Sequence, residues 1–423
     1  MNRHTHFLLV VALITILTGC SNEPQLSFMA GGAPNEIAYW ESVTERFTEE
    51  TGIPVRLIRQ TTDTDQRKQS IIMALRGRRS DPDVMLVDVA WIGQLAASDW
   101  LYPLNDYDID ISPFFQSVIS LANFYNDQLI GIPLYVDGGL LYYRKDLLER
   151  YGFSGPPQHW SELLDMAKKV QLNERNVNDN FWGFVWQGAQ YEGLVCNVVE
   201  IFTSAGGGIL DQDGNSKLMD PNNLEALEFM TSLIHTHKIS PPNTFTDMKE
   251  EEVRMSFQAG NAMFQRNWPY AWGLHNAQGS GVRGNVGIAP LPSFQQNSSA
   301  ATLGGWHAVI SSYTDVPEKA VKFLKYITSY DVQRDMALNL GWNPGRTDIY
   351  DDPQIREAMP HLIELKPVFE NAVPRPVVPY YAEISSVLQR YINAALAGLM
   401  SPQDALERAD RAVSKIIKSY EQN

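Results

Sequence analysis

Cysteine and basic residues are scarce in this sequence, and both shortages exclude classes of protein. Among its 423 residues are only two cysteines, Cys20 and Cys196, too few for a disulfide framework or a four-thiolate zinc site. The 34 Lys and Arg are outnumbered by 49 Asp and Glu, which gives a net charge of −15. Nucleic acids and anionic membrane surfaces bind proteins through an excess of basic residues. We therefore expect no nucleic-acid partner.

The common local signatures of catalysis are also missing. The sequence contains no P-loop, no GxGxxG after a predicted strand, no HExxH and no GxSxG. Beyond the N-terminal segment that contains His4 and His6, one close pair of histidines remains, His235 and His237; its i, i+2 spacing would point the two rings apart on a helix. We predict no metal site, no cofactor and no enzymatic activity, although a site assembled from distant parts of the chain leaves no local signature.

Long hydrophobic runs are absent as well, since no stretch reaches the roughly 20 apolar residues that span a bilayer. The apolar run over residues 7–17 follows Arg3, which is typical of a signal peptide. It ends in Leu17-Thr18-Gly19-Cys20, which resembles a bacterial lipobox. The alternative is an ordinary secretory signal in which the cysteine occurs by chance.

We predict from this pattern that residues 1–19 are a signal peptide and that Cys20 becomes the lipidated first residue. Residues 20–27 would then tether the protein to the extracytoplasmic side of a cell membrane. The second cysteine, Cys196, lies in an apolar, helix-like run. We expect it to be a buried, inert thiol.

Strands and helices alternate in the part of the chain that follows this leader. Apolar strands are predicted at residues 26–30, 55–58 and 83–88. A helix capped by Asn35 follows the first strand, and its buried stripe is predicted to contain Ile37, Trp40, Val43 and Phe47. A second helix, with Ile71, Ile72 and Leu75 inward, precedes the third strand. This order predicts a right-handed α/β unit with a parallel sheet.

A second block of alternating elements begins near Leu134. Helical patterns lie over residues 160–171, 191–205, 223–237, 247–260, 317–341 and 385–420. Residues 211–215 have the composition of a hairpin turn. Because no long flexible linker separates the two blocks, we predict an α/β protein of two lobes joined by several short crossings.

Carboxylates, aromatic rings and one arginine stand at predicted strand ends and glycine turns, where open α/β sheets bind ligands. They are Glu36, Asp88, Tyr135, Asp137, Trp268, Tyr270, Trp272, Trp306 and Arg375. This mixture suits a neutral sugar, whose hydroxyls both donate and accept hydrogen bonds and whose C–H faces lie flat on aromatic rings. Each residue also has a purely structural interpretation, such as helix capping for Asp88 and turn packing for Trp268. Trp40 and Trp100 are expected in the core.

Several segments together resemble the extracellular solute-binding lipoproteins of ABC sugar importers, of the maltose-binding type. They include the lipobox, Asp81-Pro82-Asp83-Val84, Gly131-Ile132-Pro133-Leu134-Tyr135, Tyr142-Tyr143-Arg144-Lys145-Asp146-Leu147 and Gln258-Ala259-Gly260-Asn261-Ala262-Met263. The resemblance covers nearly all of the mature chain. It is more specific to the trehalose/maltose-binding branch in Tyr191-Glu192-Gly193-Leu194-Val195-Cys196 and in the segment from Pro374 to Tyr381.

The resemblance implies a periplasmic-binding-protein fold, or Venus flytrap, with a disaccharide held between two lobes. It implies an N-terminal lobe of residues 28–136 plus 304–330 and a C-terminal lobe of 137–303 plus 331–423, with crossings near 135–138, 302–306 and 328–333. The sugar contacts that it implies are Glu36, Arg67, Asp88, Tyr135, Asp137, Trp268, Tyr270, Gly305, Trp306 and Arg375. Nothing in the local sequence marks Arg67, for which a solvated helix face is the alternative.

The resemblance further implies a monomeric receptor that passes its cargo to the membrane subunits of an ABC permease, with an ATPase acting from another chain. One alternative is a secreted glycoside hydrolase, because that chemistry also places paired carboxylates around a sugar. Another keeps the fold and changes the cargo to a longer maltodextrin, another disaccharide or a glycerol phosphodiester. With only Arg67 and Arg375 near the predicted site, an anionic cargo is disfavoured.

Overall fold

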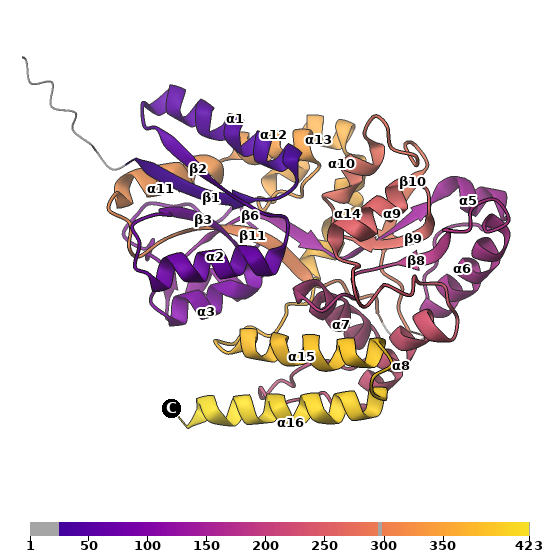
Figure 1. Cartoon of the computed structure of the whole chain (residues 1–423). Helices are drawn as coiled ribbons and strands as arrows, with labels where there is room; N and C mark the ends of the chain where they lie inside the picture. The colour runs from indigo at the N-terminus through magenta and orange to yellow at the C-terminus, as the bar shows by residue number, and fades with distance from the viewer. Residues whose placement is uncertain (1–24, 295–297, 423) are drawn as a thin grey trace, which may run out of the picture.

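In a computed structural model that describes residues 25–294 and 298–422, the chain forms two lobes, each built on a β-sheet covered by helices (Figure 1). This is the predicted α/β architecture. Cys20 and the predicted signal peptide lie outside the described residues. Within the described ranges, no helix is both long enough and apolar enough to cross a membrane.

The sheet of the first lobe has the strand order β2-β1-β3-β11-β6. Its strands are β1 (Leu26–Gly31), β2 (Val55–Gln60), β3 (Val84–Asp88), β6 (Ile132–Gly138) and β11 (Leu303–Ile310). As predicted, β1 is parallel to β2 and β3. The sheet as a whole is mixed, because β11 returns from the second lobe and pairs antiparallel with β3 and β6. That return pairs Trp306 with Asp88 and with Tyr135.

Helix α1 (Pro34–Thr51) differs in one detail from the prediction, which placed the cap at Asn35. The helix begins two residues earlier, with Pro34, whose fixed φ suits a first helical position, and Ala33 is the N-cap. The capping interaction comes from Glu36, whose Oε2 accepts a hydrogen bond of 3.0 Å from the Ala33 N–H. Of the predicted stripe, Trp40, Val43 and Phe47 are buried, whereas Ile37 is half-buried.

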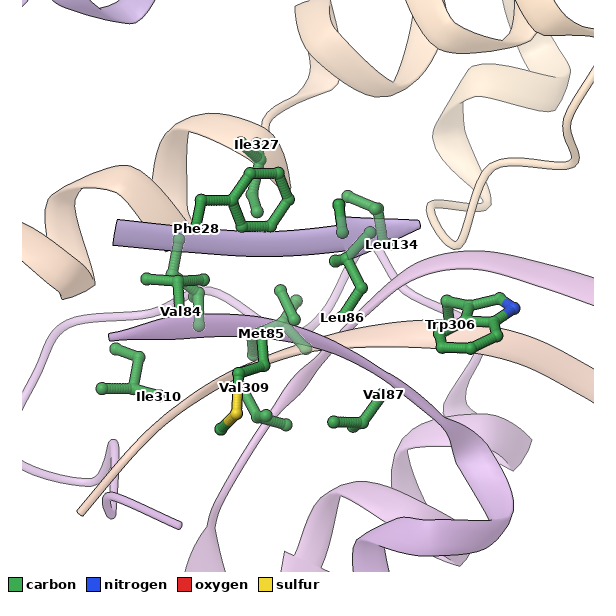
Figure 2. Close-up of a cluster of buried hydrophobic side chains, with 14 of the residues drawn as sticks. Phe28, Val84, Met85, Leu86, Val87, Leu134, Trp306, Val309, Ile310 and Ile327 are labelled. Carbon is green, nitrogen blue, oxygen red and sulfur yellow. The ribbon is translucent and has the colours of Figure 1, made fainter. Parts of the chain in front are cut away.

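The core of the first lobe surrounds β3, whose apolar side chains are at most 1% exposed. In Figure 2, Val84 and Leu86 lie on one side of the strand and Met85 and Val87 on the other, so both faces are buried. Burial of each aliphatic side chain stabilises the fold by roughly 1.5–3 kcal/mol, so the position of this strand is strongly fixed. It therefore fixes the position of Asp88, its last residue.

The sheet of the second lobe has the order β10-β7-β9-β8. Its strands are β7 (Leu140–Arg144), β8 (Trp182–Val185), β9 (Ala262–Asn267) and β10 (Val286–Pro290). The helices that matter for the cleft are α6 (Trp160–Glu174), α7 (Glu192–Ser204), α8 (Pro221–His235), α9 (Glu250–Gln258) and α10 (Ala271–Asn276). Helices α6, α7 and α8 lie within a few residues of their predicted limits.

Two predicted helical stretches are each divided into two helices. The stretch 317–341 contains α11 (Pro317–Ile327) and α12 (Tyr330–Leu340), and Ser329 caps the second of them. The C-terminal stretch contains α15 (Tyr381–Leu396) and α16 (Pro402–Glu421), which pack side by side (Figure 1). The predicted lobe limits stay a prediction. They assign residues 331–423 to the C-terminal lobe, whereas Val332 and Met336 of α12 pack with the core around the first-lobe sheet.

Candidate functional site

A cavity of about 470 Å³ lies between the lobes. That volume falls within the range of about 300–1,000 Å³ found for small-molecule sites. The structure brings all ten residues predicted as sugar contacts to its walls: Glu36, Arg67, Asp88, Tyr135, Asp137, Trp268, Tyr270, Gly305, Trp306 and Arg375. Trp272, which stood among the sequence candidates, instead contacts the ring of His361, with 4.6 Å between ring centroids.

Arg67, on α2 (Thr64–Arg76), is buried rather than solvated and is only 5% exposed. Its guanidinium carbon lies 3.4 Å from the centroid of the Trp306 ring. Trp306 also packs edge-on against Trp91, with 5.3 Å between centroids. The Nε and Nη2 atoms of Arg67 are buried without a hydrogen-bond partner among the described residues. They are donors that a bound molecule can satisfy.

Glu36 faces the same part of the cavity from the start of α1. Burial raises the pKa of this carboxyl to about 8, although Arg67 and the hydrogen bond from Ala33 oppose the change. The side chain can therefore donate as well as accept a hydrogen bond near neutral pH. A hydroxyl group, which also does both, matches it in either protonation state.

Asp137 lies near the end of β6, where the chain leaves the first sheet. Burial and the nearby charge of Asp88 raise the pKa of Asp137 to about 7. Beside it, the Tyr135 ring contacts that of Trp342, with 4.2 Å between centroids. Trp342 lines the cavity and was not predicted from the sequence, although its Gly341-Trp342-Asn343-Pro344 setting is like that of the aromatic residues selected there.

The two glycines before Trp306 let β11 approach its neighbours closely. Gly305 has φ +118°, and a Cβ there would lie 2.4 Å from the Tyr135 carbonyl oxygen. A Cβ on Gly304 would lie 2.9 Å from the Trp268 ring. Since real Cβ atoms do not approach so closely, the glycines are needed to place β11 between Tyr135 of one lobe and Trp268 of the other.

Arg375 links carboxylates from two distant parts of the fold. Its Nη2 donates to Asp88 Oδ1 at 2.6 Å and its Nη1 donates to Glu192 Oε1 at 2.9 Å. Burial alone would lower the pKa of Arg375, but Asp88 and its other neighbours hold it well above its ordinary value. Asp88 also accepts a hydrogen bond of 2.8 Å from the Ala90 N–H. Asp88 therefore has both of the roles considered from the sequence, because it caps the following turn and also lines the cavity.

Glu192 is a cavity residue that the sequence interpretation missed. Besides Arg375, it accepts hydrogen bonds from the Tyr381 hydroxyl and, at 2.5 Å, from the Ser385 hydroxyl. All four residues, Glu192, Arg375, Tyr381 and Ser385, are at most 5% exposed. The motif around Glu192 was noted, but its partners lie more than 180 residues away and left no local signal.

The wall from the second lobe contains Trp268 and Tyr270, which follow β9. The guanidinium carbon of Arg266 lies 3.9 Å from the Trp268 ring centroid, and its Nε donates to Glu200 Oε2 at 2.9 Å. The Tyr270 hydroxyl donates to Glu251 Oε1 at 2.7 Å. These contacts fix the ring positions before any ligand arrives.

The cavity wall is acidic. It contains the carboxylates of Glu36, Asp63, Asp88, Asp137, Glu192, Asp247, Glu250, Glu251 and Glu252, and the cations of Arg67, Lys249 and Arg375. Arg375 is already paired with two carboxylates, and Lys249 forms an ion pair with Asp63. An anionic group would therefore meet net repulsion. Uncharged donors such as hydroxyls meet acceptors on every side. Cys196 also reaches the wall but is 2% exposed, and burial raises the pKa of its thiol.

Comparison with known proteins gives matches along most of the chain. The sequence profile of the family described as "Bacterial extracellular solute-binding protein" matches residues 33–334. A "Probable ABC transporter-binding protein" from Deinococcus radiodurans is 34% identical over 376 residues, which are 88% of this chain and 89% of that protein.

Solved structures agree with these sequence matches. The maltose-bound structure of T. maritima MalE3 has a TM-score of 0.88 and 39% identity, covering 93% of this chain and 99% of that one. An ABC transporter solute-binding protein from Thermotoga lettingae, bound with α-D-tagatose, has a TM-score of 0.84 and 27% identity, covering 93% of this chain and 99% of that one. The predicted two-lobed fold is confirmed.

Proposed function

Because the chain belongs to the bacterial extracellular solute-binding proteins, we propose that it is the sugar receptor of an ABC importer and captures a disaccharide of the trehalose or maltose type. The observation that carries this proposal is the cavity between the lobes, where aromatic rings and carboxylates converge from both sides. The maltose bound in the 39% identical T. maritima structure supports the same class of ligand.

The ligand chemistry follows from the wall of the cavity. The apolar C–H faces of a glucose unit would rest on the rings of Trp268 and Trp306, which offer a large contact area with few rotatable bonds. Its hydroxyls would bond Glu36 and Asp137 and would supply acceptors to the unpartnered Arg67 donors. A sugar held in this way touches both lobes.

Lobe closure is the transport signal in this proposal. A ligand that contacts both lobes stabilises the closed form over the open one by its additional contacts. The closed receptor would deliver its sugar to the permease while Cys20, acylated, holds the monomer on the extracytoplasmic side of the membrane. No covalent bond of the sugar changes on this chain.

Calorimetry on the mature protein tests the site. Trp268→Ala and Trp306→Ala should each weaken binding of trehalose or maltose by at least about 1 kcal/mol, because buried aromatic anchors dominate binding energies. Trp182→Ala, in β8 and outside the cavity wall, is the control and should leave affinity unchanged. Unchanged affinity in both cavity variants would contradict the site. A thermal-shift screen over disaccharides would identify the cargo, since a ligand of the native state raises Tm.

The glycoside hydrolase alternative has one observation in its favour, namely the raised pKa values of Glu36 and Asp137. A carboxyl protonated at neutral pH is what the general acid of a glycosidase requires. Incubation of the purified protein with trehalose and maltose distinguishes the two functions. We expect no glucose to be released; sustained release that disappears in Glu36→Gln or Asp137→Asn would favour the hydrolase.

A further inference from the structure

Two ion pairs, Arg375 with Asp88 and Lys249 with Asp63, join separate parts of the cavity wall. They differ in the contacts that surround them. Arg375 and Asp88 are supported by the buried network around Glu192. Lys249 and Asp63 stand on two helix ends that face each other, Asp63 as the N-cap of α2 in the first lobe and Lys249 as the N-cap of α9 in the second. Both residues line the cavity.

The two oxygens of Asp63 have separate partners. Oδ1 accepts a hydrogen bond of 3.0 Å from the Gln66 N–H and so caps α2, the helix that carries Arg67. Oδ2 binds Lys249 Nζ. Lys249 Nζ also lies 5.3 Å from the centroid of the Tyr191 ring. The side chains of Lys249 and Asp63 are 37% and 18% exposed, so the pair is partly shielded from water.

We propose that Lys249 and Asp63 form an electrostatic latch that stabilises the closed lobes and slows release of the sugar. This proposal rests on the proposed function in one respect, because one of the two measurements that test the latch is the affinity for a sugar. Its atoms lie in different lobes, so any opening that separates α2 from α9 must break the pair. The attraction belongs to the closed form and is present whether or not a ligand fills the cavity.

The charges of the pair persist across the physiological pH range. Burial would lower the pKa of Lys249, but its hydrogen bond to Asp63 raises it overall. Burial would likewise raise the pKa of Asp63, but Lys249 and the backbone donors of α2 lower it overall. Salt, rather than pH, is therefore the variable that weakens the latch. A partly exposed ion pair is screened as the Debye length falls from about 10 Å at 0.1 M to about 3 Å at 1 M.

The test uses Asp63→Asn, Lys249→Met and the double variant. Asn is as good an N-cap as Asp, so Asp63→Asn removes the charge and keeps the start of α2. A closely matched control pair is Lys217 with Asp220, at 3.4 Å, with side chains 34% and 18% exposed. Asp220 also caps a helix, α8, but both partners lie in the second lobe. Lys217→Met and Asp220→Asn therefore remove a similar ion pair that does not join the lobes.

Binding of an uncharged disaccharide is measured by calorimetry and stopped-flow at 0.02 and 0.5 M NaCl. We expect each latch variant to raise Kd about 2- to 5-fold at low salt, mainly through faster dissociation. The double variant should bind the sugar no more weakly than either single variant does. Raising the salt concentration should weaken sugar binding by wild type more than sugar binding by the latch variants. The control variants should match wild type. Unchanged Kd, additive effects or an unchanged salt dependence in the latch variants would overturn the proposal.

Small-angle X-ray scattering of the ligand-free protein gives a readout that needs no sugar. At low salt, wild type should be more compact than the double latch variant, and high salt should remove the difference. Equal radii of gyration at low salt would contradict the latch even if sugar binds. Failure of every disaccharide to bind wild type would overturn the proposed function, while the scattering comparison would still decide on the latch.

Discussion

The buried carboxyl of Glu36 predicts how the stability of this protein depends on pH. In the cavity between the lobes, burial raises the pKa of Glu36 from 4.5 to about 8. The perturbation that isolates this group is Glu36→Gln, which keeps the shape and an oxygen acceptor for the Ala33 N–H but cannot ionise. Any stability difference that varies with pH between wild type and this variant then reports the ionisation of Glu36.

The sign follows from proton binding in the two states. Between pH 4.5 and about 8, the native protein holds the Glu36 proton and the unfolded chain has lost it. Stability therefore falls as pH rises through this interval. At about 1.4 kcal/mol per pH unit, the loss reaches roughly 3 kcal/mol at pH 7 and roughly 5 kcal/mol above pH 8. These figures are upper limits, because lobe opening lets water reach the carboxyl group.

Thermal unfolding of ligand-free protein from pH 5 to pH 9 measures the effect. The Tm of Glu36→Gln should exceed that of wild type by a margin that grows up to about pH 8 and then levels off, at about 1 °C per kcal/mol for a chain of this length. Asp137 titrates in both proteins, so its own ionisation largely cancels from the difference, although its charge is one of the causes that raise the pKa of Glu36. Glu45→Gln, an exposed position on the same helix, should run parallel to wild type. A parallel curve for Glu36→Gln would refute the reasoning.

Two further predictions concern what holds the cavity wall. Gly305→Ala should reduce the free energy of unfolding in urea by at least about 2 kcal/mol, because its positive φ and the nearby Tyr135 carbonyl leave no room for a Cβ; Gly93→Ala, where a Cβ meets nothing within 4 Å, should not destabilise the protein. Arg266→Met should cost about 3–5 kcal/mol by leaving Glu200 buried without its cation, whereas loss of the exposed Arg59–Glu41 pair in Arg59→Met should change stability by less than about 1 kcal/mol.

Local patterns predicted the elements that position the site, because burial leaves a signal within each element. Strand β3 is apolar on both faces, and its end placed Asp88 at the cavity. Clusters of glycine and aromatic residues likewise marked Trp268 and Trp306. The mistaken cap at Asn35 has a local cause, since proline at the first helical position moved the helix start to Pro34.

Residues whose role depends on distant partners could not be found in this way. Arg67 was placed only by family resemblance, because its partner Trp306 is remote in sequence. Glu192 has partners more than 180 residues away, and Lys249 pairs with a residue 186 positions earlier. Side-chain pairing across lobes depends on how the two sheets face each other, and no local pattern records that arrangement. Trp342 is the exception, since the rule that selected the other aromatic residues would have selected it.

The hydrogen-bond network that joins Arg375 to Glu192, Tyr381 and Ser385 also has a consequence for biosynthesis. Tyr381 and Ser385 belong to α15, near the end of the chain, yet they hold Glu192, which in turn aligns Arg375 with Asp88. A chain is synthesised from its N-terminus, and every strand of both sheets precedes α15 in the sequence, so both sheets can form while this part of the cleft is still incomplete. The receptor therefore acquires its full binding surface only after its last helices have emerged and docked. A premature stop codon before α15 would leave the strands of both sheets, but it would remove the partners of Glu192 and the part of the second-lobe core that α15 and α16 supply.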